Sequence, residues 1–120
     1  MVEFSVPYPP SVNRIWRQGK GRVHKSKEYQ DWIALAAWEM RAQLGPQKVI
    51  SKPFKLEVRV NRPDKRKRDL DNLLKPLLDL IGHYGLIEND SLCHWIDARW
   101  KGEGRLCYIT IGELKDGEAQ

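Results

Sequence analysis

The sequence predicts one small domain of the α/β class, more closely the α+β type, with two helices and a mixed four-stranded sheet in the order βαβαββ. Strands are indicated where apolar and polar residues alternate, most clearly over residues 54–60. Helices are indicated over two longer segments whose apolar residues recur every three or four positions, the period of a helix buried on one side. A chain of 120 residues can bury such a core without a disulfide or a structural metal.

The N-terminal part of the chain predicts one short strand followed by irregular segments. Val2, Phe4 and Val6 alternate with polar residues as far as Pro7, which favours a strand. Residues 7–14 contain too many prolines for a helix or a central strand. Residues 15–27 are rich in glycine, lysine and arginine, so we expect a mobile basic loop there and a candidate binding element.

The first helix is expected between Ser26, a favourable N-cap, and Leu44, because Gly45 and Pro46 would stop it. One apolar stripe should face the core, made of Tyr29, Trp32, Ile33, Ala36, Ala37, Met40 and Leu44. A second, narrower stripe lies opposite, made of Leu35, Trp38 and Ala42. A helix that is apolar on two sides should be covered on two sides. We hypothesise that a second copy of the chain covers this stripe in a homodimer, and a loop of the same chain is the alternative.

The second half of the chain predicts the remaining elements. The strand at 54–60 should end in a turn at 61–64, and a second helix should run from about Asp69 to Tyr84. Its core face consists of Leu70, Leu73, Leu74, Leu77, Leu80, Ile81 and Tyr84. Pro76 should kink this helix, because its ring displaces the hydrogen bond to the Asn72 carbonyl. Residues 92–100 and 105–111 predict a hairpin around 101–104, and the polar tail at 113–120 should be frayed.

The charge of the chain is unevenly distributed. Residues 1–75 hold 17 basic and 8 acidic groups, a net charge of +9, whereas residues 76–120 hold 4 and 8, a net charge of −4. This basic excess favours a polyanion as partner, most often nucleic acid. The longest apolar stretch has seven residues and the N-terminus lacks an export signal, so we expect a cytoplasmic protein without a membrane span. Cys93 and Cys107 lack the close paired spacing of zinc sites, and we expect both to be reduced.

An acidic cluster with a lysine lies at the start of the expected second helix. Asp69 and Asp71 can face one point only if Asp69 precedes the helix proper, whereas Asp71 and Lys75 share the face opposite the leucines. Carboxylate oxygens of this kind suit Mg²⁺ or Mn²⁺, with a substrate phosphate completing the coordination shell. The alternative is ordinary helix chemistry, in which Asp69 is an N-cap and Lys75 forms a salt bridge with Asp71 or Asp79.

Four cations, Lys65, Arg66, Lys67 and Arg68, come immediately before this cluster. A basic run of this kind is usually a solvated loop. Its position directly beside the acids favours a functional interpretation, because one set of groups would hold a phosphate backbone and the other a metal ion next to it.

The motif RDLDNLLK at 68–75 resembles the signature of the RusA family of Holliday junction resolvases. The motif PPSVNR at 9–14 resembles the N-terminal motif of that family, and the acidic loop at 88–90 falls where the family has its third acid. This resemblance covers nearly the whole chain. It implies a small mixed α/β homodimer that cuts four-way DNA junctions by Mg²⁺-dependent hydrolysis of a phosphodiester.

The resemblance also implies roles for individual residues. Asp69, Asp71 and Asp90 would bind the metal, Lys75 would be the catalytic lysine, and Arg68 would contact phosphate. The family often has two adjacent aspartates in the last loop, and here the first of them is Asn89, which leaves Asp90 as the better ligand and Glu88 as a weaker one.

Other residues have alternative interpretations that remain open. Asn13 and Arg14 would position DNA or belong to a packed proline-rich loop. Trp16 is the tryptophan we expect to touch DNA, and we interpret Asp79 as structural. Two other functions fit the same acids: a less selective metal-dependent nuclease acting on flaps or RNA, and a DNA-binding protein without catalysis, in which the acids only cap a helix.

Overall fold

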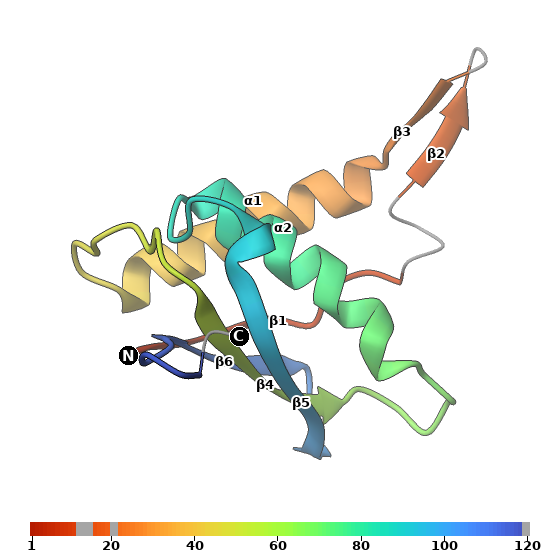
Figure 1. Cartoon of the computed structure of the whole chain (residues 1–120). Helices are drawn as coiled ribbons and strands as arrows, with labels where there is room; N and C mark the ends of the chain where they lie inside the picture. Colours follow the sequence, from red (N-terminus) through yellow and green to blue (C-terminus); the bar gives the residue numbers. More distant parts are fainter. Residues whose placement is uncertain (12–15, 20–21, 119–120) are drawn as a thin grey trace.

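The computed structural model describes residues 1–11, 16–19 and 22–118. Its centre is a four-stranded mixed sheet in the spatial order β1-β6-β4-β5, and the two helices, α1 and α2, lie together on one face of it (Figure 1). This arrangement confirms the predicted single α+β domain. The strands of the sheet are β1 (Val2–Pro7), β4 (Phe54–Arg62), β5 (Cys93–Glu103) and β6 (Leu106–Glu113), and the helices are α1 (Lys27–Gln43) and α2 (Leu74–Tyr84).

Helix α1 begins and ends where the sequence predicts. The Ser26 side chain accepts a hydrogen bond from the Tyr29 backbone N–H at 3.2 Å and so caps the first turn. The predicted core stripe is confirmed, because Tyr29, Trp32, Ala36 and Met40 are buried. The second stripe is not covered by the described part of the chain. Trp38 is 69% exposed and Leu35 52% exposed, so a covering loop is not present among the described residues.

The second helical segment changes geometry near its start. A short 3₁₀ helix, η2 (Leu70–Leu73), precedes α2, which begins at Leu74. The expected cause of a kink at Pro76 is therefore absent from α2, and the kink itself stays a prediction. Pro76 is the third residue of α2, within the first turn, where backbone N–H groups have no partner inside the helix and the proline ring displaces no hydrogen bond. The predicted core face is confirmed by the burial of Leu73, Leu77, Leu80 and Ile81.

Strands β5 and β6 do not pair with each other, so the predicted hairpin is wrong. Both flank β4, which pairs in parallel with β5 and antiparallel with β6. Strand β6 buries Cys107, Ile109 and Ile111 and occupies an inner position, whereas β5 is half-exposed and forms the edge. Local alternation predicts a strand but not its neighbour, because any apolar-faced strand can pair with β4.

Asn61 holds the link between β5 and β6 across the end of β4. Its side-chain N–H donates to the Lys101 carbonyl at 2.7 Å, and its carbonyl oxygen accepts from the Leu106 N–H at 3.2 Å. Gly104 has a φ of 144° and lies so close that a Cβ there would be 2.7 Å from Asn61 Oδ1. The turn predicted at 61–64 begins two residues later than expected, since β4 continues to Arg62.

Residues 15–27, expected as an irregular loop, contain two short strands, β2 (Trp16–Gly19) and β3 (Arg22–Lys25), followed by the start of α1. They pair as an antiparallel hairpin that projects from the body directly before α1 (Figure 1). Asn13 and Arg14 lie outside the described residues, as does the side chain of Trp16. At the other end of the chain, Leu114 donates a backbone hydrogen bond to Pro53 O at 2.9 Å, so ordered pairing extends one residue past β6.

The core lies between the sheet and the two helices. A row of apolar side chains crosses the sheet from Phe4 through Ile109 and Val58 to Ala98.

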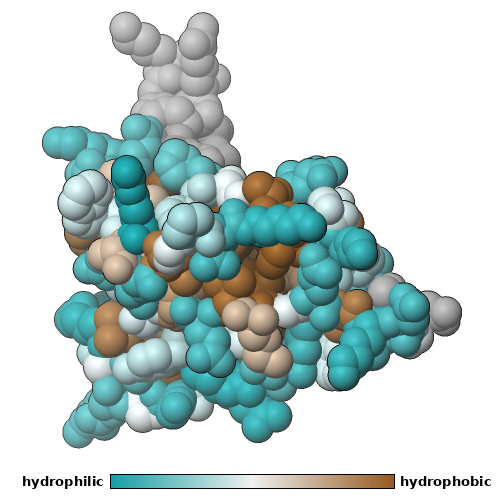
Figure 2. Space-filling model, turned by 90° about the vertical axis from the view of Figure 1, so that its left-hand side faces the viewer, coloured by the Kyte–Doolittle hydropathy of each residue, from teal (hydrophilic) through white to brown (hydrophobic). Residues whose placement is uncertain are grey.

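Both cysteines are free, and burial raises the pKa of the Cys107 thiol to about 12. Among the described helices, none is long and apolar enough to cross a membrane. Figure 2 shows the side of the molecule that lies on the left in Figure 1. The surface there is mainly hydrophilic, with an apolar hollow near its centre.

Candidate active site

Of the two acids in the 68–75 motif, Asp69 has an extended backbone and Asp71 lies in a 3₁₀ turn. Asp69 precedes η2, and its backbone is extended, with φ −90° and ψ 119°. The two carboxylates can face one point only if Asp69 lies before the helix, and this condition is met. Asp69 stands at the N-cap position, yet its side chain makes no capping hydrogen bond and instead accepts from Asn72 Nδ2 at 3.4 Å. Asp69 and Asp71 are both exposed. The geometry thus provides no helix-capping role for either carboxylate.

Lys75 is held by Asp79, one turn further along α2. The Lys75 Nζ atom lies 3.0 Å from Asp79 Oδ1, so the salt bridge that the sequence left open is formed with Asp79 and not with Asp71. The second oxygen of Asp79 accepts a hydrogen bond of 2.9 Å from the Tyr29 hydroxyl. Tyr29 is buried on α1, so a core residue of one helix fixes the partner of a lysine on the other. Asp79 therefore links Lys75 to the buried Tyr29, and its interpretation as a structural residue stays a prediction.

Charges around Lys75 stabilise its ammonium form. The hydrogen bond and the charge of Asp79 raise the pKa of Lys75, and the charge of Asp90 acts in the same direction. Burial, followed by the hydrogen bond to Asp79, raises the pKa of Tyr29. Lys75 is thus a cation, and Tyr29 is a neutral donor to Asp79, over the whole physiological range.

The third acid lies in a second 3₁₀ turn, η3 (Asp90–Leu92), which packs against α2. The Asn89 side chain caps this turn by accepting from the Ser91 N–H at 2.8 Å. Asn89 therefore has a local structural role, which an aspartate at this position could also fill. Asp90 is exposed and close enough to Lys75 for its charge to act on the ammonium group.

The structure does not close a metal site around the three acids: Asp69 and Asp71 lie at the start of α2, whereas Asp90 lies in η3, which packs against α2. The turn η2 packs against β5 and η3 packs against α2, so Asp69, Asp71 and Asp90 come from neighbouring elements. Within the described part of the chain, no group of three metal-ligating side chains is close enough to hold an ion. None of the three acids is ion-paired to a described residue, so their oxygen atoms are available to a hard cation.

The basic run before the acids is organised by Asp64, which the sequence analysis did not identify. Both carboxylate oxygens accept from Arg68, at 3.1 Å from Nε and 2.6 Å from Nη2. Arg66 binds the same carboxylate at 3.1 and 3.0 Å. These hydrogen bonds hold the pKa of Asp64 well below its usual range, and the bonds from Arg68 have the largest effect. Two of the four cations are therefore oriented, while Lys65 and Lys67 are exposed.

Tyr8 and Arg105 lie beside this loop and were also missed. The Arg68 guanidinium lies over the Tyr8 ring, 5.6 Å from its centroid, and the Tyr8 backbone N–H donates to the Arg105 carbonyl at 2.9 Å. Arg105 belongs to the link between β5 and β6, far from Tyr8 in sequence. No local pattern could have identified it, because only the position of β6 between β1 and β4 brings it here. Asp64 could have been identified from the sequence, because it lies two residues before Arg66 and four residues before Arg68, close enough along the chain to pair with both.

The chain was compared with known proteins. A family model described as "Endodeoxyribonuclease RusA" matches residues 7–111. The chain is 38% identical over 83 residues to the crossover junction endodeoxyribonuclease RusA of Aquifex aeolicus (strain VF5), a match that covers 69% of the chain and just under two thirds (65%) of that protein. It is 34% identical over 122 residues to the protein of the same name from Escherichia coli O139:H28 (strain E24377A / ETEC), covering 94% of the chain and 95% of that protein.

Proposed function

Because the chain belongs to the RusA family of endodeoxyribonucleases, we propose that it is a structure-selective endonuclease that resolves four-way DNA junctions by Mg²⁺-dependent hydrolysis of phosphodiester bonds. Its role would lie in DNA recombination and repair. The observation that carries the proposal is the family match over residues 7–111, which includes the whole acidic motif at the start of α2. The cytoplasmic location expected from the sequence stays a prediction.

The donor set fits a hard divalent cation. Asp69, Asp71 and Asp90 provide exposed carboxylates that no described cation occupies, and carboxylate oxygens are the ligands that Mg²⁺ prefers. Mn²⁺ would fit the same oxygens. Because the three acids do not form a closed set, the DNA phosphate would complete the coordination. The bound ion would polarise the scissile phosphate and lower the pKa of a water molecule.

Lys75 contributes a positive charge that is held by Asp79 and lies within reach of the charge of Asp90. Asp79 and Tyr29 hold its ammonium group at the start of α2, where it would stabilise the negative charge that develops on the phosphate. Asp79 keeps Lys75 away from Asp71, so the carboxylate of Asp71 stays available to the metal. Lys75 thus acts as an electrostatic group in this proposal and not as a base, because its pKa is raised.

The DNA would be held by the basic residues before the motif. Arg66 and Arg68 are oriented by Asp64, Lys65 and Lys67 are exposed, and Arg14 lies in the N-terminal motif of the family, outside the described residues. Branched DNA would bind chiefly through its phosphates, which fits the net charge of +9 over residues 1–75.

A homodimer is the second part of the proposal. A four-way junction requires two symmetric cuts, and a twofold dimer provides two sites related by that symmetry. The exposed Trp38 and Leu35 on α1, with Ala42 beside them, form an apolar strip that a second copy would cover, with Trp38 as anchor. Sedimentation of Trp38→Glu tests this face: the variant should be a folded monomer at micromolar concentration. A folded dimer would assign the interface elsewhere.

One experiment separates the proposed function from its alternatives. End-labelled four-way, flap, duplex and RNA substrates are incubated with and without Mg²⁺. We expect paired symmetric nicks on the four-way junction only, requiring Mg²⁺, and binding that persists without it. Cleavage of flaps or RNA at similar rates would indicate a less selective nuclease. Binding without any nicking under all conditions would indicate a DNA-binding protein without catalysis.

A further inference from the structure

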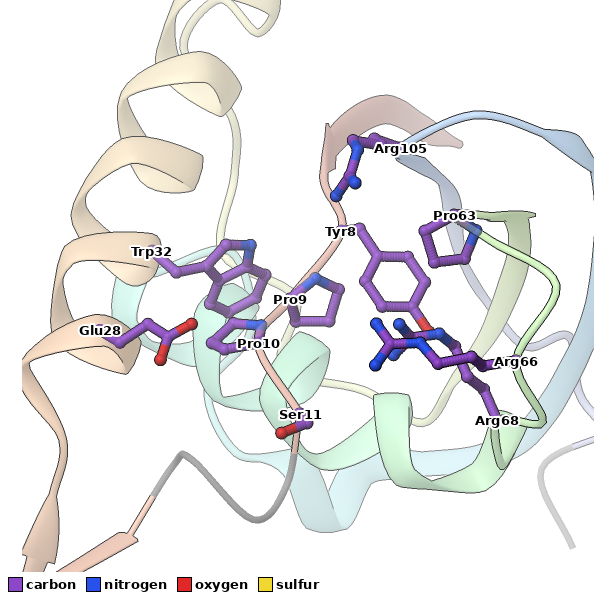
Figure 3. Close-up of a pocket in the computed structure, with 10 residues that line it drawn as sticks. All are labelled: Tyr8, Pro9, Pro10, Ser11, Glu28, Trp32, Pro63, Arg66, Arg68 and Arg105. Atoms are coloured by element: carbon purple, nitrogen blue, oxygen red, sulfur yellow. The ribbon is translucent and has the colours of Figure 1, made fainter.

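A pocket of about 380 Å³ lies beside the candidate active site (Figure 3). Three arginines surround it, Arg66 and Arg68 from the loop after β4 and Arg105 from the link between β5 and β6. Tyr8 and the prolines that follow it form one wall, and Trp32 and Glu28 of α1 lie across from the arginines. Its volume is in the range of small-ligand sites, roughly 300–1,000 Å³, so it has room for one nucleotide.

The charges of this pocket favour an anion. Its lining carries three guanidinium groups and the carboxylate of Glu28, and with Asp64, which is ion-paired to two of the arginines, the formal net charge is +1. Asp64 holds the guanidinium groups of Arg66 and Arg68, and the hydrogen bond from the Tyr8 N–H to the Arg105 carbonyl holds the backbone of the third arginine beside the same wall. A planar guanidinium pairs with a phosphate through two parallel hydrogen bonds, so pre-oriented arginines match a phosphodiester in particular.

A second hollow lies between the pocket and the acidic motif. A neighbouring hollow of about 200 Å³ shares Tyr8, Pro10, Ser11 and Arg68 with it and extends to Asp69 and Asn72. The two hollows therefore adjoin at these shared residues, with Arg105 in the lining of one and Asp69, the first candidate metal ligand, in the lining of the other. A DNA strand whose scissile phosphate lies at Asp69 could therefore continue into the three-arginine pocket.

We propose that the three-arginine pocket binds the sugar-phosphate of a single unpaired nucleotide of the cleaved strand, next to the scissile phosphate. This inference rests on the proposed junction endonuclease function and adds to it a source of structural selectivity. A nucleotide stacked in a duplex cannot enter a pocket of this size without leaving the stack. Unstacking costs least where pairing is already interrupted, as at the point of strand exchange, so the pocket favours branched over linear DNA.

Arg105→Ala is the variant that tests the proposal, because it removes one guanidinium from the pocket and keeps the backbone bond to Tyr8. Arg41→Ala is the matched control, since Arg41 is exposed in the last turn of α1 and does not line the pocket. Dissociation constants are measured without divalent metal, at one salt concentration, for a four-way junction and for a linear duplex of the same sequence. We expect Arg105→Ala to weaken junction binding about tenfold and duplex binding less than twofold, and Arg41→Ala to weaken both slightly and equally.

A second readout uses the unmodified protein. A fluorescent adenine analogue, 2-aminopurine, is placed at the exchange point of the junction, and its emission should rise on binding because the base leaves the stack. Equal weakening of junction and duplex by Arg105→Ala, or an unchanged emission, would overturn the proposal and indicate ordinary contact with duplex phosphates. Junction cleavage by the unmodified protein is scored separately. If it is present while selectivity survives Arg105→Ala, the pocket assignment fails and the proposed function stands.

Discussion

Two groups of aspartates lie within one short part of this molecule and differ in their partners. Asp64 in the loop after β4 binds two arginines, and Asp79 in the middle of α2 binds a lysine and a buried tyrosine. Asp69, Asp71 and Asp90, at the start of α2 and in η3, are exposed and are ion-paired to no described residue. The first group orients the chain's own cations. In the function proposed above, the second group binds a metal ion, so the two groups would differ in role as they differ in partners.

The largest expected effect is on the unpaired acids. Asp71→Asn should reduce junction cleavage at least about a thousandfold, because it removes a charged metal ligand, and should leave binding intact or tighter, because it removes a negative charge facing phosphates. The measurements are single-turnover cleavage of a labelled junction and a binding titration. Asp31→Asn is the matched control, an exposed acid on α1. Wild-type cleavage by Asp71→Asn would contradict the metal assignment.

A smaller effect is expected on the paired acid that holds Lys75. Asp79→Asn should reduce the cleavage rate about tenfold with unchanged junction affinity, because Lys75 loses its fixed position. Asp79 raises the pKa of Lys75, so its removal lowers that pKa, and the alkaline limb of the rate profile should move to lower pH.

Tyr29→Phe is the control variant for Asp79→Asn, because it disturbs the position of the Asp79 side chain without changing its charge. It keeps the Asp79 charge and removes only the hydrogen bond from α1, so it should reduce the rate less than Asp79→Asn and leave the alkaline limb nearly in place. An identical pH profile for all three proteins would mean that Asp79 only stabilises the fold.

The basic loop should show a difference between free and paired cations. Lys67→Ala should reduce the slope of log affinity against log salt by about one unit, because an exposed lysine on a phosphate releases one counterion. Arg66→Ala should reduce it by less, because Asp64 already neutralises part of the charge of Arg66. Equal slopes for both variants and the unmodified protein would show that the basic residues at 65–68 form a solvated loop without phosphate contacts.

The smallest effect concerns Asp64 itself, on acidification. A carboxyl whose pKa is lowered in the folded state stays charged below its ordinary pKa of about 3.9 and contributes stability that is lost only as pH falls through the lower folded value. The Asp64 carboxyl ¹³C shift should therefore stay constant from pH 7 to about pH 4. A midpoint near 3.9 would show that the arginine pairs do not persist in solution.

Apart from β2 and β3, the chain order of elements and the core faces followed from local patterns. Ser26 caps α1 as its side-chain chemistry predicts, and the alternation at 54–60 and the leucines of 70–84 gave the buried faces correctly. The identity of Asp69, Asp71, Lys75 and Asp90 as a group came from the motif and its resemblance to the family, because spacing alone left helix capping and salt bridges open.

Only the tertiary structure decided which strands pair and which charged groups meet. Local alternation gave β5 and β6 as strands, yet both pair with β4, because pairing depends on which faces are buried and not on adjacency in sequence. The bond from Tyr29 to Asp79 joins residues 50 positions apart, and Arg105 reaches the pocket only because β6 lies between β1 and β4. A sequence fixes each residue's chemistry and local geometry, whereas contacts between distant segments arise only when the whole core closes.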